Sequence, residues 1–360
     1  MFVDMMKKVH CGINLQREIF KRYRESGFSN GYLRRLKACT EENVWQKVNF
    51  IELGEENSGS TIGVIKLASD WIPTAGFFAL LHRLLCGLYF ADRLGLIPVA
   101  DAWVGCAYEE QIPVNGSRNV FEYYYEPLSD ITMQSALNSQ NVVRISDFNM
   151  DLVFLKYHCE WFNMSETFIN EMGRLYKKYI RFNEATREKL DTDVLNILQK
   201  KKTLGIHFRG TDYAVGAVGH PVALSIEDYF YYMDYALEHF SFEQIFVATD
   251  DAGALRKLKE RYSNIICYDD VLRAEGKVSV AFLKRENMEL PKYRAGYEVI
   301  RDTYTLSLCD GLIVGQSQVS TNARILRAAS DKPFDYSTVL TKGILRKGVD
   351  WREEFKKLKI

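Results

Sequence analysis

One pattern occurs three times in the second half of this chain of 360 residues: a short apolar run, then polar residues, then a stretch with helical periodicity. The apolar runs begin at Leu204, Gln244 and Gly311. Strands that alternate with helices favour right-handed βαβ units and one parallel sheet. Loops that leave the carboxyl ends of such strands meet in one crevice. The pattern therefore predicts an α/β fold with a candidate binding site at that edge.

A similar series in the first half predicts a second parallel sheet. Strands are expected at 61–67 and 96–100, with a helix at about 75–94 between them. Two further helices, at about 165–182 and 185–200, lead to the first strand of the later sheet, so we place a domain boundary near residue 196. Residues 1–195 are expected to form a Rossmann-like domain with a helical N-terminal extension, and residues 196–335 a second Rossmann-like domain. Residues 336–360 are expected to form a tail that packs back over the first domain.

The first polar loop contains His207, Arg209 and Asp212. His207 and Arg209 are two residues apart, so in an extended strand their side chains point to the same side. The planar fork of Arg209 can bind two phosphate oxygens at once and keeps its charge, which favours a diphosphate site. The alternative is an Arg–Asp ion pair that only closes the turn, because structural pairs look the same in a sequence.

Two other residues point to a nucleotide. Ser317 stands where the helix after the third strand begins, so its hydroxyl and the following backbone N–H groups could hold phosphate oxygens. Asp302 lies in a helical run, 297–309, just before that strand. Its carboxylate can accept two hydrogen bonds from guanine N1–H and N2–H, a pair that adenine and uracil do not offer.

These segments resemble a known family. His207-Phe-Arg-Gly-Thr-Asp212, Phe246-Val-Ala-Thr-Asp-Asp251, and Asp302 through Asp310 to Ser317-Gln318-Val319 are similar to three motifs of inverting GDP-fucose-dependent fucosyltransferases. The resemblance is to the α1,6-fucosyltransferase type, including rhizobial nodulation fucosyltransferases, with protein O-fucosyltransferases as more distant relatives. It covers about the second half of the chain, with weaker echoes at 75–82 and 119–127.

The resemblance implies a GT-B architecture, GDP-fucose as donor substrate, and neither a metal nor another cofactor. On it, Arg209 corresponds to the diphosphate arginine and Ser317 to a phosphate ligand. His207 and Asp302 correspond to guanine contacts, and Gly76 to the glycine of an N-terminal loop that approaches the donor. Further donor-binding residues expected from the same motifs and loop are Phe77, Asp212, Asp250, Asp251 and Gln318.

This chain departs from the family pattern in two places. Many α1,6 enzymes have two adjacent arginines where this chain has Arg209-Gly210, and an acid in the next loop, where residues 214–220 contain none. His220 is the titratable side chain of that loop, and a neutral imidazole could take a hydroxyl proton, so we predict it as the catalytic base. The alternative is a loop histidine without chemistry.

Two acidic pairs, Asp250–Asp251 and Asp269–Asp270, raise the alternative of a metal site, since hard cations prefer carboxylates. We favour a metal-free reaction, because an arginine and a helix N-terminus can stabilise a departing diphosphate, and Asp250 could instead orient Arg209. Neither the G-x-G-x-x-G fingerprint nor a P-loop occurs in the sequence. The aromatic block 121–125 could stack on an acceptor sugar, although aromatic residues this dense are usually core.

Composition excludes other classes of protein. The 47 basic and 47 acidic residues give zero net charge, so no global field recruits nucleic acid. Seven scattered cysteines without a C-x-x-C pair are typical of reduced thiols in a cytosol. No apolar run approaches the ~20 residues of a membrane helix, and no signal peptide is evident. The basic helical stretch 1–50 is either a solvated face or a weak dock on an anionic membrane.

The functional hypothesis is a glycosyltransferase that moves fucose from GDP-fucose to a hydroxyl of a glycan or lipid-linked glycan with inversion. We expect it in the cytoplasm, either dissolved or peripherally bound at the inner face of the plasma membrane, in the synthesis of bacterial envelope polymers or exopolysaccharide. One alternative is a GT-B transferase that uses another nucleotide sugar. A second is a non-catalytic nucleotide-binding scaffold of a glycan-assembly complex.

Overall fold

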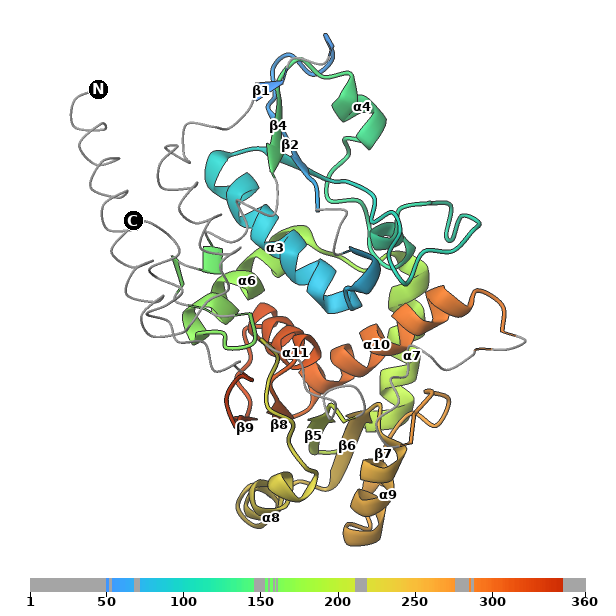
Figure 1. Cartoon of the computed structure of the whole chain (residues 1–360), viewed down its shortest axis with the longest axis vertical. Helices are drawn as coiled ribbons and strands as arrows, with labels where there is room; N and C mark the ends of the chain where they lie inside the picture. The colour runs from blue at the N-terminus through green and yellow to red at the C-terminus, as the bar shows by residue number, and fades with distance from the viewer. Residues whose placement is uncertain are drawn as a thin grey trace, which may run out of the picture.

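The structure is a computed structural model that describes residues 50–51, 54–67, 72–145, 153–154, 156–157, 159, 161–210, 219–275, 285 and 288–345 (Figure 1). Asp212, the basic N-terminal stretch and residues 346–360 of the predicted tail lie outside the described residues. The first sheet lies toward one end of the molecule and the second toward the other, with α3, α6, α10 and α11 between them (Figure 1).

The first sheet has four strands in the order β1-β4-β2-β3. The strand β2 (Ile62–Ile65) pairs in parallel with both β3 (Ile97–Ala100) and β4 (Val142–Ile145), and β1 (Phe50–Ile51) is antiparallel to β4. The helix α3 (Phe77–Leu94) joins β2 to β3 and ends at Gly95, whose φ of 65° suits a residue without a Cβ. This β-α-β unit is the one that the sequence predicts.

The second sheet has five parallel strands in the order β7-β6-β5-β8-β9. Every residue of β5 (Thr203–Phe208), β6 (Gln244–Thr249) and β8 (Gly311–Gly315) is buried, as expected for a parallel sheet covered on both faces. The strand β7 (Ile265–Ile266) lies at one edge. The predicted α/β fold with parallel sheets is therefore confirmed.

At the other edge of this sheet, the structure differs from the prediction for residues 336–360. Residues 336–340 form β9 (Tyr336–Leu340), which pairs in parallel with β8 along its whole length, so the predicted tail begins as a strand of the second sheet. The run Tyr-Ser-Thr-Val-Leu is rich in β-branched and aromatic residues, which fit a pleated surface. The described strands of the first sheet all precede residue 196, and those of the second all follow it.

Side-chain caps determine where several helices begin. Ser165, Asn183, Asp251 and Ser317 each accept a hydrogen bond from the backbone N–H three residues later. They start, in order, α6 (Glu166–Tyr179), α7 (Glu184–Leu198), α9 (Ala252–Arg261) and α11 (Gln318–Ala329). The helix α10 (Pro291–Leu308) begins before the predicted residue 297, because a proline at the first helical position suits a helix start. The remaining helices are η1 (Ile72–Thr74), η2 (Val120–Tyr123), α4 (Met133–Leu137) and α8 (Glu227–Phe240).

Helices cover both faces of the second sheet. Leu204 and Ile206 of β5 pack in a core cluster with α8 and α9, whereas Phe246 of β6 packs with α10 and α11 on the other face. Side chains alternate between the faces of a strand, so His207 lies on the side of α10 and α11. This placement brings His207 to the beginning of α11.

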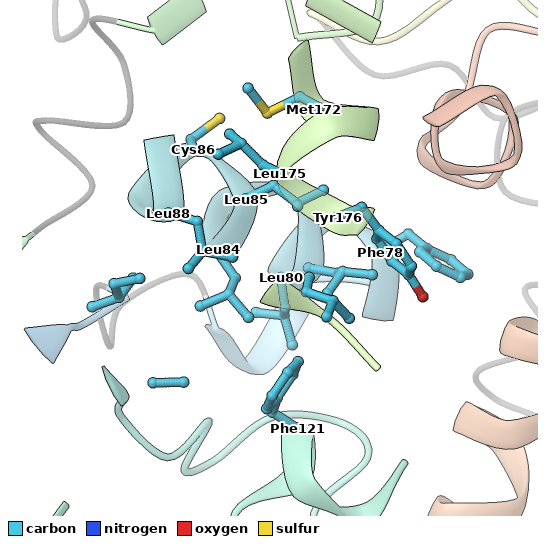
Figure 2. Close-up of a cluster of buried hydrophobic side chains, with 14 of the residues drawn as sticks. Phe78, Leu80, Leu84, Leu85, Cys86, Leu88, Phe121, Met172, Leu175 and Tyr176 are labelled. Carbon is cyan, nitrogen blue, oxygen red and sulfur yellow. The ribbon is translucent and has the colours of Figure 1, made fainter. Parts of the chain in front are cut away.

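One hydrophobic core joins the two halves of the chain. Leu85 and Cys86 of α3 lie beside Met172 and Leu175 of α6, whereas Leu80 of α3 points toward Phe121 (Figure 2). The same cluster contains residues of the second half, namely Tyr297, Ile300 and Ile325. The two sheets are therefore held by one shared core between them.

Gly173 of α6 permits a close approach of α6 to α11. A Cβ at this position would lie 2.7 Å from the Cβ of Ala328 and 3.0 Å from the backbone of α11. We expect Gly173→Ala to destabilise the protein by about 1–3 kcal/mol through overpacking, despite the better helix propensity of alanine. Asn170→Ala, at an exposed position of the same helix, is the control and should not lower the melting temperature. Equal melting temperatures for Gly173→Ala and wild type would contradict the close packing of α6 on α11.

Candidate functional site

A cavity of about 460 Å³ lies at the carboxyl ends of β5 and β6. Its wall contains His207 and Arg209 after β5, Asp250 after β6, and a row of residues on one side of α10 that includes Asp302. Tyr108 closes it from the first half of the chain. The volume lies within the range of small-molecule sites, and the position is the crevice that parallel topology predicts.

Arg209 and Asp250 form an ion pair in this cavity. Arg209 Nη1 lies 2.7 Å from Asp250 Oδ2, and the backbone N–H of Gly210 donates to Asp250 Oδ1 at 3.0 Å. The Arg209 side chain is 34% exposed and that of Asp250 is 10% exposed. Asp250 therefore orients the guanidinium, while part of the guanidinium faces the cavity. Both expectations for Arg209, an ion pair at the turn and an anion contact, are compatible with this geometry.

His207 is a neutral imidazole in the cavity wall. Burial, helped by the charge of Arg209, lowers the pKa of His207 to about 3. Its Nδ1 lies 2.9 Å from Ser320 Oγ and 3.4 Å from Ser317 Oγ. Ser317 accepts a hydrogen bond from the backbone N–H of Ser320 at 3.0 Å and so caps α11 as the sequence predicts. His207 is thus tied to the first turn of α11.

Asp302 lines the same cavity from α10. Burial raises the pKa of Asp302 to about 7, although the charges of Arg301 and Arg273 act in the opposite direction. Arg301 does not bond Asp302, because its guanidinium donates to Asp193 at 3.0 Å and to Asp270 at 2.5 Å. The Asp302 carboxyl therefore changes charge near neutral pH, and hydrogen-bond donors from a ligand would favour its ionised form.

The motifs did not identify Arg285 and Glu298, which also line the cavity. Arg285 Nη1 and Nη2 donate to Glu298 Oε1 and Oε2 at 2.8 and 2.7 Å. Glu298 lies on α10 one turn before Asp302, a spacing that a helical reading of this segment could have revealed. Arg285 precedes α10 outside every motif, so its sequence position carried no signal.

Gly76 and Phe77 lie at the start of α3. The Phe77 side chain is 1% exposed and packs edge-on against Trp103, Tyr108 and Tyr124, so its ring belongs to the core. Its backbone N–H donates to the hydroxyl of Tyr108 at 3.1 Å, and through Tyr108 it touches the cavity wall. A Cβ on Gly76 would meet nothing within 4 Å, so packing does not require glycine there.

Four other predicted residues do not line the cavity: Ser317, whose cap of α11 is described above, and Asp251, Gln318 and His220. Asp251 accepts from the backbone N–H of Ala254 at 2.9 Å and caps α9. Gln318 turns toward the first half of the chain, where its Oε1 lies 2.7 Å from His82 Nδ1 and its Nε2 donates to the carbonyl of Trp161 at 2.9 Å. His220 is exposed, and its ring centroid lies 5.2 Å from that of Phe162.

Within the described residues, no group of three or more His, Cys, Asp or Glu side chains is arranged to hold a metal ion. The five described cysteines, Cys86, Cys106, Cys159, Cys267 and Cys309, are buried. Among the described helices, none combines the length and apolar character needed to cross a membrane.

Comparison with known proteins extends this description. Residues 163–325 match the family model described as α-(1,6)-fucosyltransferase N- and catalytic domains. This range contains β5, β6, β8, α10 and most of α11, and with them nearly all of the cavity wall. The resemblance to GDP-fucose-dependent fucosyltransferases that the motifs predicted is therefore confirmed. No curated protein matches the chain.

Solved structures of fucosyltransferases are similar to this one. NodZ from Bradyrhizobium has 17% identity and a TM-score of 0.46, over 74% of this chain and 93% of NodZ. A mutant of Arabidopsis thaliana FUT1 in complex with GDP has 11% identity and a TM-score of 0.42, over 94% and 81%. Apo POFUT1 has 10% identity and a TM-score of 0.42, over 79% and 99%. Because these TM-scores lie below 0.5, the similarity carries no argument about the fold. The assignment of an α/β fold rests on the two sheets of this structure.

The raised pKa of Asp302 predicts how this residue affects stability. Burial penalises its charged form, so the penalty is absent below the ordinary pKa of about 3.8, grows as the pH rises, and is complete above about 7. We expect Asp302→Asn to raise the melting temperature at pH 8 and to leave it unchanged at pH 3.5. Asp269→Asn, whose side chain is 90% exposed, is the control. A lower melting temperature for Asp302→Asn at pH 8 would show that its charge is stabilised in the fold.

Proposed function

We propose that the protein is a glycosyltransferase that transfers fucose from GDP-fucose to a glycan hydroxyl with inversion at the anomeric carbon. The observation that carries this proposal is the cavity in which Arg209, His207 and Asp302 meet, all within the stretch that matches the α-(1,6)-fucosyltransferase model. On this proposal the two sheets form a GT-B arrangement. The second sheet then binds the donor, and the first half of the chain faces the acceptor.

The cavity offers contacts for both ends of a guanosine diphosphate. Arg209, held by Asp250 at 2.7 Å, presents a cation to the phosphates. Asp302, when ionised, can accept two hydrogen bonds from a guanine edge. The first-turn N–H groups of α11 lie next to His207 and favour negative charge. We assign Ser317 a supporting role in that turn.

Transfer of the sugar requires stabilisation of the charge that develops in the transition state. Negative charge grows on the departing diphosphate, so a cation placed beside it lowers the barrier more than it stabilises the bound donor. Arg209 is the residue that we place there. Its orientation by Asp250 means that little reorganisation is needed when the bond breaks.

We retain His220 as the proposed base for the acceptor hydroxyl. Its imidazole is exposed and lies beside Phe162 of the first half, a position open to a glycan from solvent. The carboxylates of Asp250 and Glu298 are held in ion pairs with Arg209 and Arg285, so we do not place the base on either of them. Alternatively, the acceptor proton leaves late, to the donor phosphate itself.

The setting that we propose is the cytoplasmic synthesis of a bacterial envelope polymer or exopolysaccharide, with peripheral contact at the membrane where the acceptor is lipid-linked. Seven scattered cysteines without a C-x-x-C pair support a reducing compartment. Fractionation of cells that express the full chain, followed by a salt wash, separates cytoplasmic from peripheral protein.

Arg209 provides the first test of the donor site. Replacing one such electrostatic donor typically lowers turnover by about 100- to 1,000-fold, and we expect this of Arg209→Ala together with weaker GDP binding. Arg209→Lys should recover little, because a point charge does not reproduce the guanidinium fork. Turnover is measured with GDP-fucose and a panel of glycan acceptors. Wild-type turnover in Arg209→Ala would remove the basis of the proposal.

The nucleotide itself distinguishes the alternatives. We expect GDP and GDP-fucose to raise the melting temperature of the wild-type protein, and UDP and ADP to have no such effect. Protection by UDP would favour a transferase with another donor. Binding of GDP-fucose with neither transfer nor hydrolysis would favour the non-catalytic scaffold.

His220 is tested through the pH profile. If it is the base, its loss should lower turnover by about 100-fold, and the wild-type rate should fall as the pH drops through ~6.5, the ordinary pKa of a histidine. His239→Ala, at another histidine on α8, is the matched control. A flat profile together with an active His220→Ala variant would support late proton transfer to the donor phosphate.

The proposed reaction is metal-independent. Asp250 pairs with Arg209 and Asp251 caps α9, so the two adjacent acids are committed to different partners. We therefore expect turnover to be unchanged by a chelator in excess. A collapse of turnover that added Mg²⁺ or Mn²⁺ reverses would instead assign diphosphate neutralisation to an ion.

A further inference from the structure

A second arginine stands in the wall of the cavity that contains Arg209. The guanidinium of Arg285 makes a two-pronged contact with Glu298, at 2.8 and 2.7 Å, and these side chains are 13% and 5% exposed. A fork-to-fork pair of this kind is strong and restricts the orientation of the guanidinium. Because Glu298 lies on α10, the pair fixes Arg285 in the wall of the cavity that Arg209 also lines.

Position 210, directly after Arg209, has no room for a second arginine. A Cβ at Gly210 would lie 2.3 Å from Asp251 Oδ2 and 2.6 Å from Asp251 Cβ. Asp251 cannot move away without giving up its hydrogen bond from Ala254, at 2.9 Å, which caps α9. Any side chain at position 210 would therefore break a helix cap. A second cation in this wall has to come from another segment of the chain.

Charge balance explains why a second cation is useful. Arg209 is neutralised by Asp250 and Arg285 by Glu298, so both guanidinium groups can stay in a partly buried wall without a ligand. A nucleoside diphosphate introduces two adjacent phosphates with about three negative charges near neutral pH. The two hydrogen bonds to Glu298 use two of the five N–H donors of Arg285, so others remain for phosphate oxygens.

We propose that Arg285 is a second diphosphate-binding residue, which acts with Arg209 on the same ligand, and that Glu298 is its positioning residue. The inference rests on the proposed function for the class of ligand, a nucleoside diphosphate. It adds a cation from outside the sequence motifs and assigns a role to the buried Glu298 carboxylate.

The test measures binding by calorimetry rather than transfer. The ligands are GDP, guanosine and inorganic pyrophosphate, and the variants are Arg285→Met, Arg285→Lys and Glu298→Gln. We expect Arg285→Met to weaken GDP and pyrophosphate by about 10- to 100-fold and to leave guanosine unchanged, since charged hydrogen bonds to phosphate are lost. Arg285→Lys should recover part of the affinity, and Glu298→Gln should lose less than Arg285→Met.

Arg256 provides a matched control. It forms a similar two-pronged pair with Glu275, at 3.0 and 3.4 Å, but on the exposed side of α9. Arg256→Met removes the same charge from the protein and should leave every affinity unchanged. The double variant Arg285→Met with Glu298→Gln covers the case in which an unpaired Glu298 destabilises the fold, and it should show the same selective loss for phosphate-containing ligands.

The outcomes separate this inference from the proposed function. Unchanged GDP and pyrophosphate affinities in the folded double variant would overturn the role of Arg285, as would an equal loss for guanosine, which would make the residue a support of cavity shape. Wild-type protein that binds neither GDP nor pyrophosphate would overturn both proposals. Selective loss of phosphate binding in a protein that transfers no fucose would support Arg285 and overturn fucose transfer.

Discussion

The rest of the structure depends on the parallel pairing of β5 with β6 and β8. Parallel strands need long crossover connections, and these place helices on both faces of the sheet and all carboxyl ends at one edge. His207 and Arg209 therefore leave β5 at the edge where Asp250 leaves β6. The cavity is a consequence of this topology before any side-chain contact is considered.

Paired charges keep the cavity ready for an anion. Each of its arginines has a carboxylate partner, so neither has to be buried alone, which would be costly. Asp302 lacks such a compensating contact from Arg301, and burial moves its pKa to about 7. A carboxyl in that condition is sensitive to hydrogen-bond donors, which is the property that recognition of a base edge requires.

Polar contacts across the shared core hold the beginning of α11 against the first half of the chain. Gln318 bonds His82 of α3 and the carbonyl of Trp161, and Asn322 Nδ2 donates to the carbonyl of Phe78 at 3.3 Å. Burial lowers the pKa of His82 to about 4, so this histidine is neutral and the contact holds over the physiological range of pH. The start of α11, and with it the environment of His207, is thus coupled to the first half of the chain.

The sequence by itself predicted the strands β2, β3, β5, β6 and β8 and the cap of α11 at Ser317, because hydrophobic patterning and capping are local properties of the chain. It also identified Arg209 and Asp302 through short motifs. The tertiary structure decided which residues share the cavity. Arg285 lines the cavity and pairs with Glu298 of α10, whereas Gln318 bonds His82 of α3 and does not line the cavity. Such contacts link positions far apart in the chain, and no local periodicity records them.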